Sequence, residues 1–129
     1  MSNRAVIHTN DAPQAIGPYS QAVKANGVVY LSGQIPLDPA TMELVQGDIS
    51  TQTRQVFANL SAVCLAAGGD LNQIVKLTIF LTDLADFAAV NAVMAASFSA
   101  PYPARSTVQV AALPRGAAVE VEAIMVVRS

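Results

Sequence analysis

Apolar residues recur along this chain in two spacings, and the shorter one predicts β-strands. Where apolar and polar residues alternate, an extended chain buries one face and exposes the other. Such segments, or short runs rich in β-branched and aromatic residues, are found at residues 21–24, 28–31, 74–81, 107–110 and 119–127. Asn26-Gly27 separates the first two and favours a tight hairpin turn. In the third segment, the expected buried face comprises Val75, Leu77, Ile79 and Leu81.

The longer spacing, with apolar residues three or four positions apart, predicts two amphipathic helices. The first spans residues 50–67 and ends at Gly68-Gly69, and the second begins after Asp83, a suitable N-cap, and ends before Pro101. Their apolar stripes comprise Val56, Leu60, Val63 and Ala67 in the first helix and Phe87, Val90, Met94 and Phe98 in the second. A single domain spanning residues 1–129, with both helices packed on one face of a mixed β-sheet, buries both stripes. The predicted fold class is therefore α+β.

The composition indicates that part of the apolar surface is covered by another chain. Hydrophobic residues make up 53% of the sequence and charged residues only 12%. A domain of this size exposes much of its surface, so we expect a homo-oligomer.

Charge and residue counts exclude several classes of protein. The net charge is −2 and the Lys and Arg residues are scattered, whereas tight nucleic-acid binding requires clustered cations. No apolar run approaches the roughly 18 residues of a membrane-spanning helix, and no signal peptide is evident. With one cysteine, Cys64, and one histidine, His8, the chain offers neither a disulfide nor a His/Cys metal site. We expect a cytoplasmic protein without a bound metal.

Three charged residues near the C-terminal strands are candidates for chemistry. Arg105 follows a segment stiffened by Pro101 and Pro103, and a guanidinium binds a carboxylate through two parallel hydrogen bonds. Glu120 and Glu122 share one face of the last strand, and a carboxyl group with a raised pKa can act as an acid or a base. The alternatives are an exposed arginine at a strand start and a solvated strand face.

Three further features could shape a binding site. Tyr19 follows Gly17-Pro18, a turn that would present its ring. Ser32-Gly33-Gln34, at a strand end, is expected to form a turn that exposes backbone N–H groups to an anion. Asn91 lies beside the apolar stripe of the second helix, where a polar side chain needs a partner. In isolation, each feature is more commonly structural.

Taken together and in order, nine segments resemble the Rid (reactive intermediate deaminase, YjgF-like) family. The resemblance extends from about residue 8 to residue 128, which makes it far more specific than a lone motif. The matching segments are Ile16–Val23, Ser32–Pro39, Gln55–Asn59, Val75–Leu84, Asp86-Phe87, Val90-Asn91, Pro103–Ser106, Val110–Gly116 and Val119–Ala123.

This resemblance implies a fold, an assembly and an activity. Family members fold like the small bacterial chorismate mutases and form homotrimers with sites in the clefts between subunits. Those that keep the arginine of the Pro-Ala-Arg-Ser block hydrolyse 2-aminoacrylate, 2-iminopropanoate and 2-iminobutanoate to 2-oxo acids and ammonia, without a cofactor. The expected partners are therefore a small 2-imino or 2-enamino acid and two further copies of the chain.

The resemblance also implies roles for individual residues. Arg105 is expected to clamp the substrate carboxylate, and Glu120 to activate a water molecule together with the backbone carbonyl of Thr107. Tyr19 is expected to close over the substrate, and Glu122 to be structural. Some family members carry cysteine where this chain has Thr107, so activity is expected to survive if the carbonyl does the work. The residues expected to contact the substrate are Tyr19, Ser32, Gly33, Asn91, Arg105 and Thr107.

Two other functions stay open at this point. A trimeric small-carboxylate-binding or holdase-like protein could use the same clefts without chemistry. A ribonuclease or translation inhibitor, as some family members have been described, is disfavoured by the scattered cations, the single histidine and the few aromatic residues.

Overall fold

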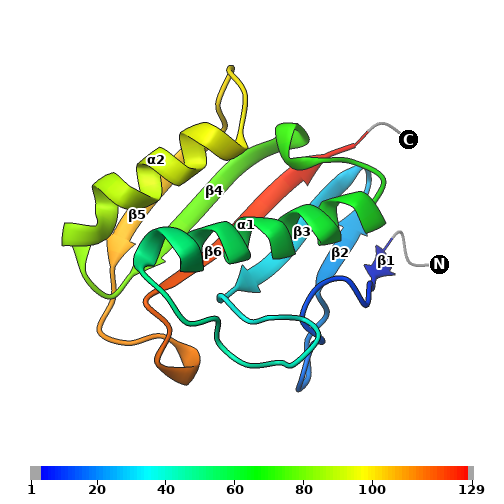
Figure 1. Ribbon diagram of the computed structural model, residues 1–129. Coiled ribbons are helices and arrows are strands. Elements are labelled where there is room, and N and C mark those ends of the chain that lie inside the picture. The colour runs from blue at the N-terminus through cyan, green and yellow to red at the C-terminus, as the bar shows by residue number, and fades with distance from the viewer. Residues whose placement is uncertain (1–3, 128–129) are drawn as a thin grey trace.

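The computed structural model describes residues 4–127, which form a six-stranded sheet covered on one face by two helices (Figure 1). The strand order is β1-β2-β3-β6-β4-β5, and every neighbouring pair is antiparallel except β4 and β5. The bounds are Arg4–Ile7 for β1, Ala22–Ala25 for β2, Val28–Gln34 for β3, Ile74–Leu81 for β4, Ala104–Gln109 for β5 and Val119–Val126 for β6. Helix α2 connects the parallel pair, as a parallel crossover requires. The predicted α+β class is confirmed.

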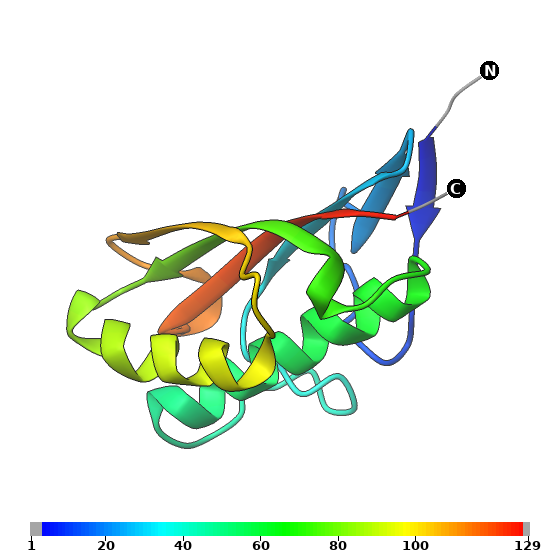
Figure 2. The ribbon, with the colours of Figure 1, turned by 90° about the horizontal axis from the view of Figure 1, so that it is seen from above.

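Carboxylates set the starts of the helical segments. Helix α1 spans Ile49–Ala66, and Asp48 Oδ1 accepts a hydrogen bond from the Thr51 backbone N–H at 2.9 Å. Helix α2 spans Phe87–Ser97 and follows a short 3₁₀ turn that Asp83 caps. Figure 2 shows both helices on the same side of the sheet, so the opposite face has no second layer.

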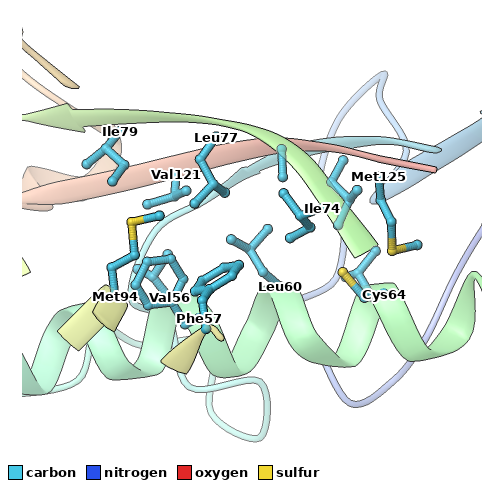
Figure 3. Packing of buried hydrophobic residues seen from close by; sticks show 14 of the residues in the cluster. Val56, Phe57, Leu60, Cys64, Ile74, Leu77, Ile79, Met94, Val121 and Met125 are labelled. Atoms are coloured by element: carbon cyan, nitrogen blue, oxygen red, sulfur yellow. The ribbon is translucent and has the colours of Figure 1, made fainter. Parts of the chain in front are cut away.

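The hydrophobic core lies between the helices and the strands that face them (Figure 3). The fully buried side chains there include Phe57, Leu60, Leu77, Ile79 and Val121. Burying one such side chain contributes about 1.5–3 kcal/mol. Phe98, which follows α2, meets Phe57 edge to face with ring centres 5.4 Å apart and joins the two helical segments. Burial raises the pKa of the Cys64 thiol to about 12, so this residue is a neutral packing group.

The expected hairpin near the N-terminus is confirmed. Strands β2 and β3 pair across Asn26-Gly27, whose φ angles are 52° and 79°. A two-residue turn of this hand requires positive φ at both positions, which asparagine and glycine tolerate best. The sequence pattern missed β1, which pairs with β2 and forms one edge of the sheet.

Two expected core positions are wrong. A register shift between Ile74 and Lys76 turns Val75 outward, where it is 48% exposed, and buries Ile74 instead. A β-bulge of this kind places an extra residue against the neighbouring strand and reverses the alternation. Phe87 is 38% exposed rather than buried, and its ring faces the guanidinium of Arg105 instead of the core.

The sheet face opposite the helices carries exposed apolar side chains. Tyr30, Val108 and Val126 alternate with inward-facing positions on their strands and are exposed. This face is where we expect a partner chain to pack. Neither helix of the described chain is long and apolar enough to cross a membrane.

Candidate active site

A hollow of about 620 Å³, here called the glutamate hollow, lies beside β3, β6 and the loop that follows β3. Glu120 on β6 and Gly33 on β3 contribute to its wall. A β-carbon built on Gly33 would lie 2.9 Å from the carboxyl carbon of Glu120, so only glycine leaves room for this carboxylate. Other lining residues include Ile16, Tyr19, Ser32, Leu37, Met42 and Arg115.

A β-bulge lies beside this contact. The residues that flank Ser32-Gly33 pair with Ala123 and Val121, so two residues of β3 stand opposite Glu122 alone. Bulges bend a strand and redirect its side chains, and they are common next to binding sites. On β6 the bulge lies opposite Glu122, two residues from Glu120. The backbone of Gly33, one of the two bulged residues, approaches the Glu120 carboxylate.

The turn expected at Ser32-Gly33-Gln34 is wrong, because these residues continue β3. The backbone N–H of Ser32 donates to the carbonyl oxygen of Gln21 at 3.0 Å, and its hydroxyl donates to the carbonyl oxygen of Ser20 at 2.6 Å. Ser32 therefore ties the strand to the segment that carries Tyr19, and its backbone N–H is already used.

The environment of Glu120 favours its protonated form. Burial raises the pKa of this carboxyl group above its usual value, and the neighbouring Glu122 carboxylate raises it further. Glu120 alternates with the buried Val119 and Val121, so its side chain leaves the sheet on the face opposite the helices. Within residues 4–127, no lysine or arginine forms an ion pair with it. Such a carboxylate binds a proton more readily than an exposed one does.

Tyr19 is presented at the edge of the glutamate hollow by a short turn. Gly17 has a φ of 115°, and its carbonyl oxygen accepts a hydrogen bond from the Tyr19 N–H at 2.9 Å. The Tyr19 hydroxyl accepts a hydrogen bond from the Ile16 N–H at 3.4 Å, and the ring is 54% exposed. The ring therefore stands where it can cover a bound molecule.

Arg105 lies in a second hollow of about 410 Å³, here called the arginine hollow, next to α2. Its Nη1 donates to Asn91 Oδ1 at 2.6 Å and contacts Met94 Sδ at 3.5 Å. Its Cζ lies 5.2 Å from the centre of the Phe87 ring, a cation–π distance. Three side chains of α2 thus hold the guanidinium in place. The hydrogen-bond partner expected for Asn91 is therefore Arg105. No carboxylate of the described chain pairs with it.

Thr107 follows on the same strand, and its hydroxyl oxygen is buried. This oxygen has no hydrogen-bond partner within residues 4–127. Buried polar atoms are nearly always paired, so this hydroxyl is an exception among the described residues.

Arg105 and Glu120 lie on opposite faces of the sheet. Arg105 pairs with Leu77, whose side chain is buried beneath the helices, whereas Glu120 pairs with Phe80, which alternates with such buried positions. Within one chain, these two groups cannot hold the same small molecule. The structure brings Tyr19, Ser32, Gly33 and Glu120 together in the glutamate hollow and Asn91 and Arg105 in the arginine hollow. Thr107 lines neither hollow.

Comparison with known proteins shows the family of the chain. A sequence model of the family described as Endoribonuclease L-PSP matches residues 9–127. The chain belongs to this YjgF/Rid family. Family membership is consistent with the sheet, the two helices and the order of the predicted segments.

Individual members of the Rid family are similar over almost the whole chain. Protein DfrA from Myxococcus xanthus is 58% identical over 125 residues, which cover 95% of each chain. The 2-iminobutanoate/2-iminopropanoate deaminase of Mus musculus is 49% identical over 123 residues, covering 95% of this chain and 91% of its own. The crystal structure of RidA from the Antarctic bacterium Psychrobacter sp. PAMC 21119 is 54% identical, with a TM-score of 0.92, and the match covers 95% of this chain and 99% of that one.

Sequence reasoning gave no role to several residues of the site, among them Met42, Arg115 and Asn59. Met42 and Arg115 line the glutamate hollow, and buried Asn59 donates hydrogen bonds to backbone carbonyls of its loop. Met42 lies between the segments predicted as strands or helices, and Arg115 lies in the matching segment Val110–Gly116, to which no role was given. Of these residues, only Asn59 could have been noticed from the sequence, because a polar side chain among the apolar positions of a helix needs a hydrogen-bond partner. Within residues 4–127, no group of three His, Cys, Asp or Glu side chains could hold a metal ion.

Proposed function

We propose that this Rid-family chain is a homotrimeric deaminase that hydrolyses 2-imino acids, including 2-iminopropanoate and 2-iminobutanoate, to 2-oxo acids and ammonia. The observation that carries the proposal is the separation of Arg105 and Glu120. Each is directed toward a hollow, neither is neutralised within residues 4–127, and they lie on opposite faces of one sheet. A site that needs both groups is complete only between two copies of the chain.

The exposed apolar sheet face supports such an assembly. A second copy that covers this face can bring its edge strand β5, with Arg105, toward the glutamate hollow of the first. In a closed ring, every subunit then donates Arg105 to one site and Glu120 to the next.

The substrate carboxylate pairs with the guanidinium of Arg105. Asn91 and Phe87 hold that guanidinium from α2, which leaves its remaining N–H groups to bind two carboxylate oxygens. Each charge-assisted hydrogen bond contributes about 1.5–3 kcal/mol. Binding at this end fixes the imine carbon in front of Glu120.

Hydrolysis requires one water molecule and two proton transfers. Glu120 and the backbone carbonyl of Thr107 from the neighbouring subunit hold the water, and Glu120 takes its proton as the oxygen attacks the imine carbon. That proton passes to the nitrogen and gives a carbinolamine. The proton of its hydroxyl group then moves to the nitrogen as well, the C–N bond breaks, and ammonia leaves as the carbonyl forms. An enamine substrate first tautomerises to the imine. Imines hydrolyse slowly without an enzyme, so positioning and electrostatics supply the acceleration without a covalent intermediate.

The site's residues support an imine hydrolase better than a ribonuclease. The single histidine, His8, is exposed, shares a hydrogen bond with Asn10 and lines neither hollow. The charged residues that line the two hollows are Glu120, Arg105 and Arg115, too few cations to neutralise an RNA backbone. A carboxylate-binding arginine and a carboxyl group with a raised pKa suit a small anionic imine.

The test is competition with a trapping reagent. Threonine dehydratase and threonine release 2-iminobutanoate, semicarbazide traps the imine, and the rate of 2-oxo acid formation measures the protein's share. Wild-type protein is expected to outcompete the trap, and Arg105→Ala to lose at least about 100-fold in kcat/KM with the trimer intact. Full activity of Arg105→Ala contradicts the arginine clamp. Saturable binding of a 2-oxo acid without any acceleration indicates a binding protein instead.

A further inference from the structure

The glutamate hollow is lined by a second charged residue, Arg115, for which the proposed reaction has no use. Its Nη1 donates to the backbone carbonyl of Met42 at 3.0 Å, across 73 positions of sequence. No carboxylate of residues 4–127 forms an ion pair with it. The positive charge therefore borders a hollow that also holds Glu120, and it stays un-neutralised within the chain.

The backbone on both sides of this hydrogen bond adopts an uncommon conformation. Met42 has a φ of 61° and Arg115 a φ of 60°, a left-handed region that residues other than glycine and asparagine seldom occupy. Such residues persist where the surrounding structure holds them, and they gather at ligand sites. The Met42–Arg115 contact thus joins two strained segments at the edge of one hollow.

The loop that carries Met42 is itself held in place. The Met42 N–H donates to the Asp38 carbonyl at 2.7 Å, and the Asp38 N–H donates to the Glu43 carbonyl at 2.9 Å. Buried Asn59 on α1 donates to the Leu37 carbonyl at 2.9 Å, and thereby ties the start of the loop to the core. The loop that accepts the hydrogen bond from Arg115 is therefore held in place. A guanidinium carries five N–H groups, so four of those of Arg115 do not take part in this hydrogen bond.

We propose that Arg115 is a specificity-determining residue that binds a second carboxylate, at the end of the substrate side chain. This proposal rests on the proposed deaminase function, in which Arg105 binds the first carboxylate. Ile16, Leu37 and Met42 supply apolar contacts for the methylene groups between the two ends. The site then accepts 2-imino dicarboxylic acids in addition to short monocarboxylic ones. The reaction is unchanged: water adds, ammonia leaves, and Arg115 makes and breaks no covalent bond.

The experiment compares two imines of equal chain length. D-amino-acid oxidase converts D-norvaline to 2-iminopentanoate, and D-aspartate oxidase converts D-glutamate to 2-iminoglutarate; the imine carbon is planar, so D-substrates give the same imines as L-substrates. Competition with semicarbazide gives kcat/KM for each imine. Arg115→Met is expected to lower kcat/KM for 2-iminoglutarate about tenfold and to change that for 2-iminopentanoate less than about twofold.

Two further variants separate charge from loop position. Arg115→Lys keeps the charge and is expected to retain most of the activity toward 2-iminoglutarate. Arg54→Met removes an exposed arginine of α1 whose side chain contacts Thr51, outside both hollows, and is expected to leave both rates unchanged. Equal losses on both imines in Arg115→Met, or no loss on either, overturn the proposal. Failure of wild-type protein to hydrolyse 2-iminopropanoate would instead reject the deaminase function itself.

Discussion

The backbone of Gly33 lies against the Glu120 carboxylate, and a methyl group at Gly33 would lie 2.9 Å from the carboxyl carbon. Because the obstructing group is the end of a flexible side chain, Gly33→Ala is expected to displace the carboxylate rather than unfold the strand. We expect kcat for imine hydrolysis to fall at least about tenfold, with a thermal midpoint close to that of wild type.

A double-mutant cycle tests whether Gly33 acts through Glu120. In a Glu120→Gln background, Gly33→Ala is expected to lower kcat only slightly further. If the two losses multiply instead, Gly33 serves the reaction by some route other than the carboxylate.

The pH dependence of catalysis is expected to report on Glu120. Its pKa is raised by burial first and by Glu122 second, and a general base is active only when deprotonated. Activity should therefore fall as the pH drops through a value above that of an ordinary glutamate. Glu122→Gln removes the like charge, so the acid limb of the kcat/KM profile is expected to move to lower pH. An acid limb that stays in place shows that Glu120 is not the titrating group.

The raised pKa of Glu120 also predicts how the stability of the fold depends on pH. A carboxyl whose pKa is higher in the folded than in the unfolded protein stabilises the fold at low pH, and this contribution is lost as the pH rises through the folded-state pKa. Glu120→Gln is therefore expected to raise the thermal midpoint at neutral pH while it abolishes turnover. A lower midpoint would show that the carboxylate stabilises the hollow.

Asn59 of α1 is expected to be the most sensitive polar residue that supports the loop beside the glutamate hollow. It is 1% exposed, donates to the carbonyls of Leu37 and Ile35, and accepts from Gln55 at 2.9 Å. Asn59→Ala leaves these groups unpaired and is expected to lower the free energy of unfolding by about 1–3 kcal/mol.

Chemical denaturation measures this change, and Gln46→Ala is the matched control. Gln46 is an exposed amide on the same loop, with one long hydrogen bond of 3.5 Å to Leu44, and its loss should change the free energy of unfolding by less than about 0.5 kcal/mol. Similar values for the two variants would mean that the Asn59 hydrogen bonds contribute little.

Much of the fold follows from local patterns in the sequence. The spacing of Val56, Leu60 and Val63 places them on one face of a helix, and that face is buried in the structure. Asn26-Gly27 favours a hairpin because both residues adopt positive φ angles readily. A β-bulge has no comparable local sequence pattern, because the register of a strand depends on the strands beside it in the sheet. The position of Val75 was wrong for this reason, and so was the turn expected at Ser32-Gly33.

The candidate residues of the site came from the resemblance to the Rid family, and their arrangement did not follow from the sequence. Position alone left Arg105 and Glu120 as ordinary strand residues, and alternation within each strand does not say which face of the sheet each strand presents. Only the pairing of Arg105 with Leu77 and of Glu120 with Phe80 separates the two groups. Arg115 escaped notice because its contact with Met42 joins residues that are far apart in sequence.

The most direct test of the shared site is complementation between two inactive variants. Arg105→Ala and Glu120→Gln, each carrying a different affinity tag, are co-expressed, and mixed trimers are isolated through both tags. If each site takes Arg105 from one subunit and Glu120 from the next, one of the three sites in every mixed trimer regains both groups. Imine hydrolysis is then expected to return in the mixed trimers, although each variant alone is inactive. Mixed trimers that stay as inactive as the separate variants would contradict a site built between subunits.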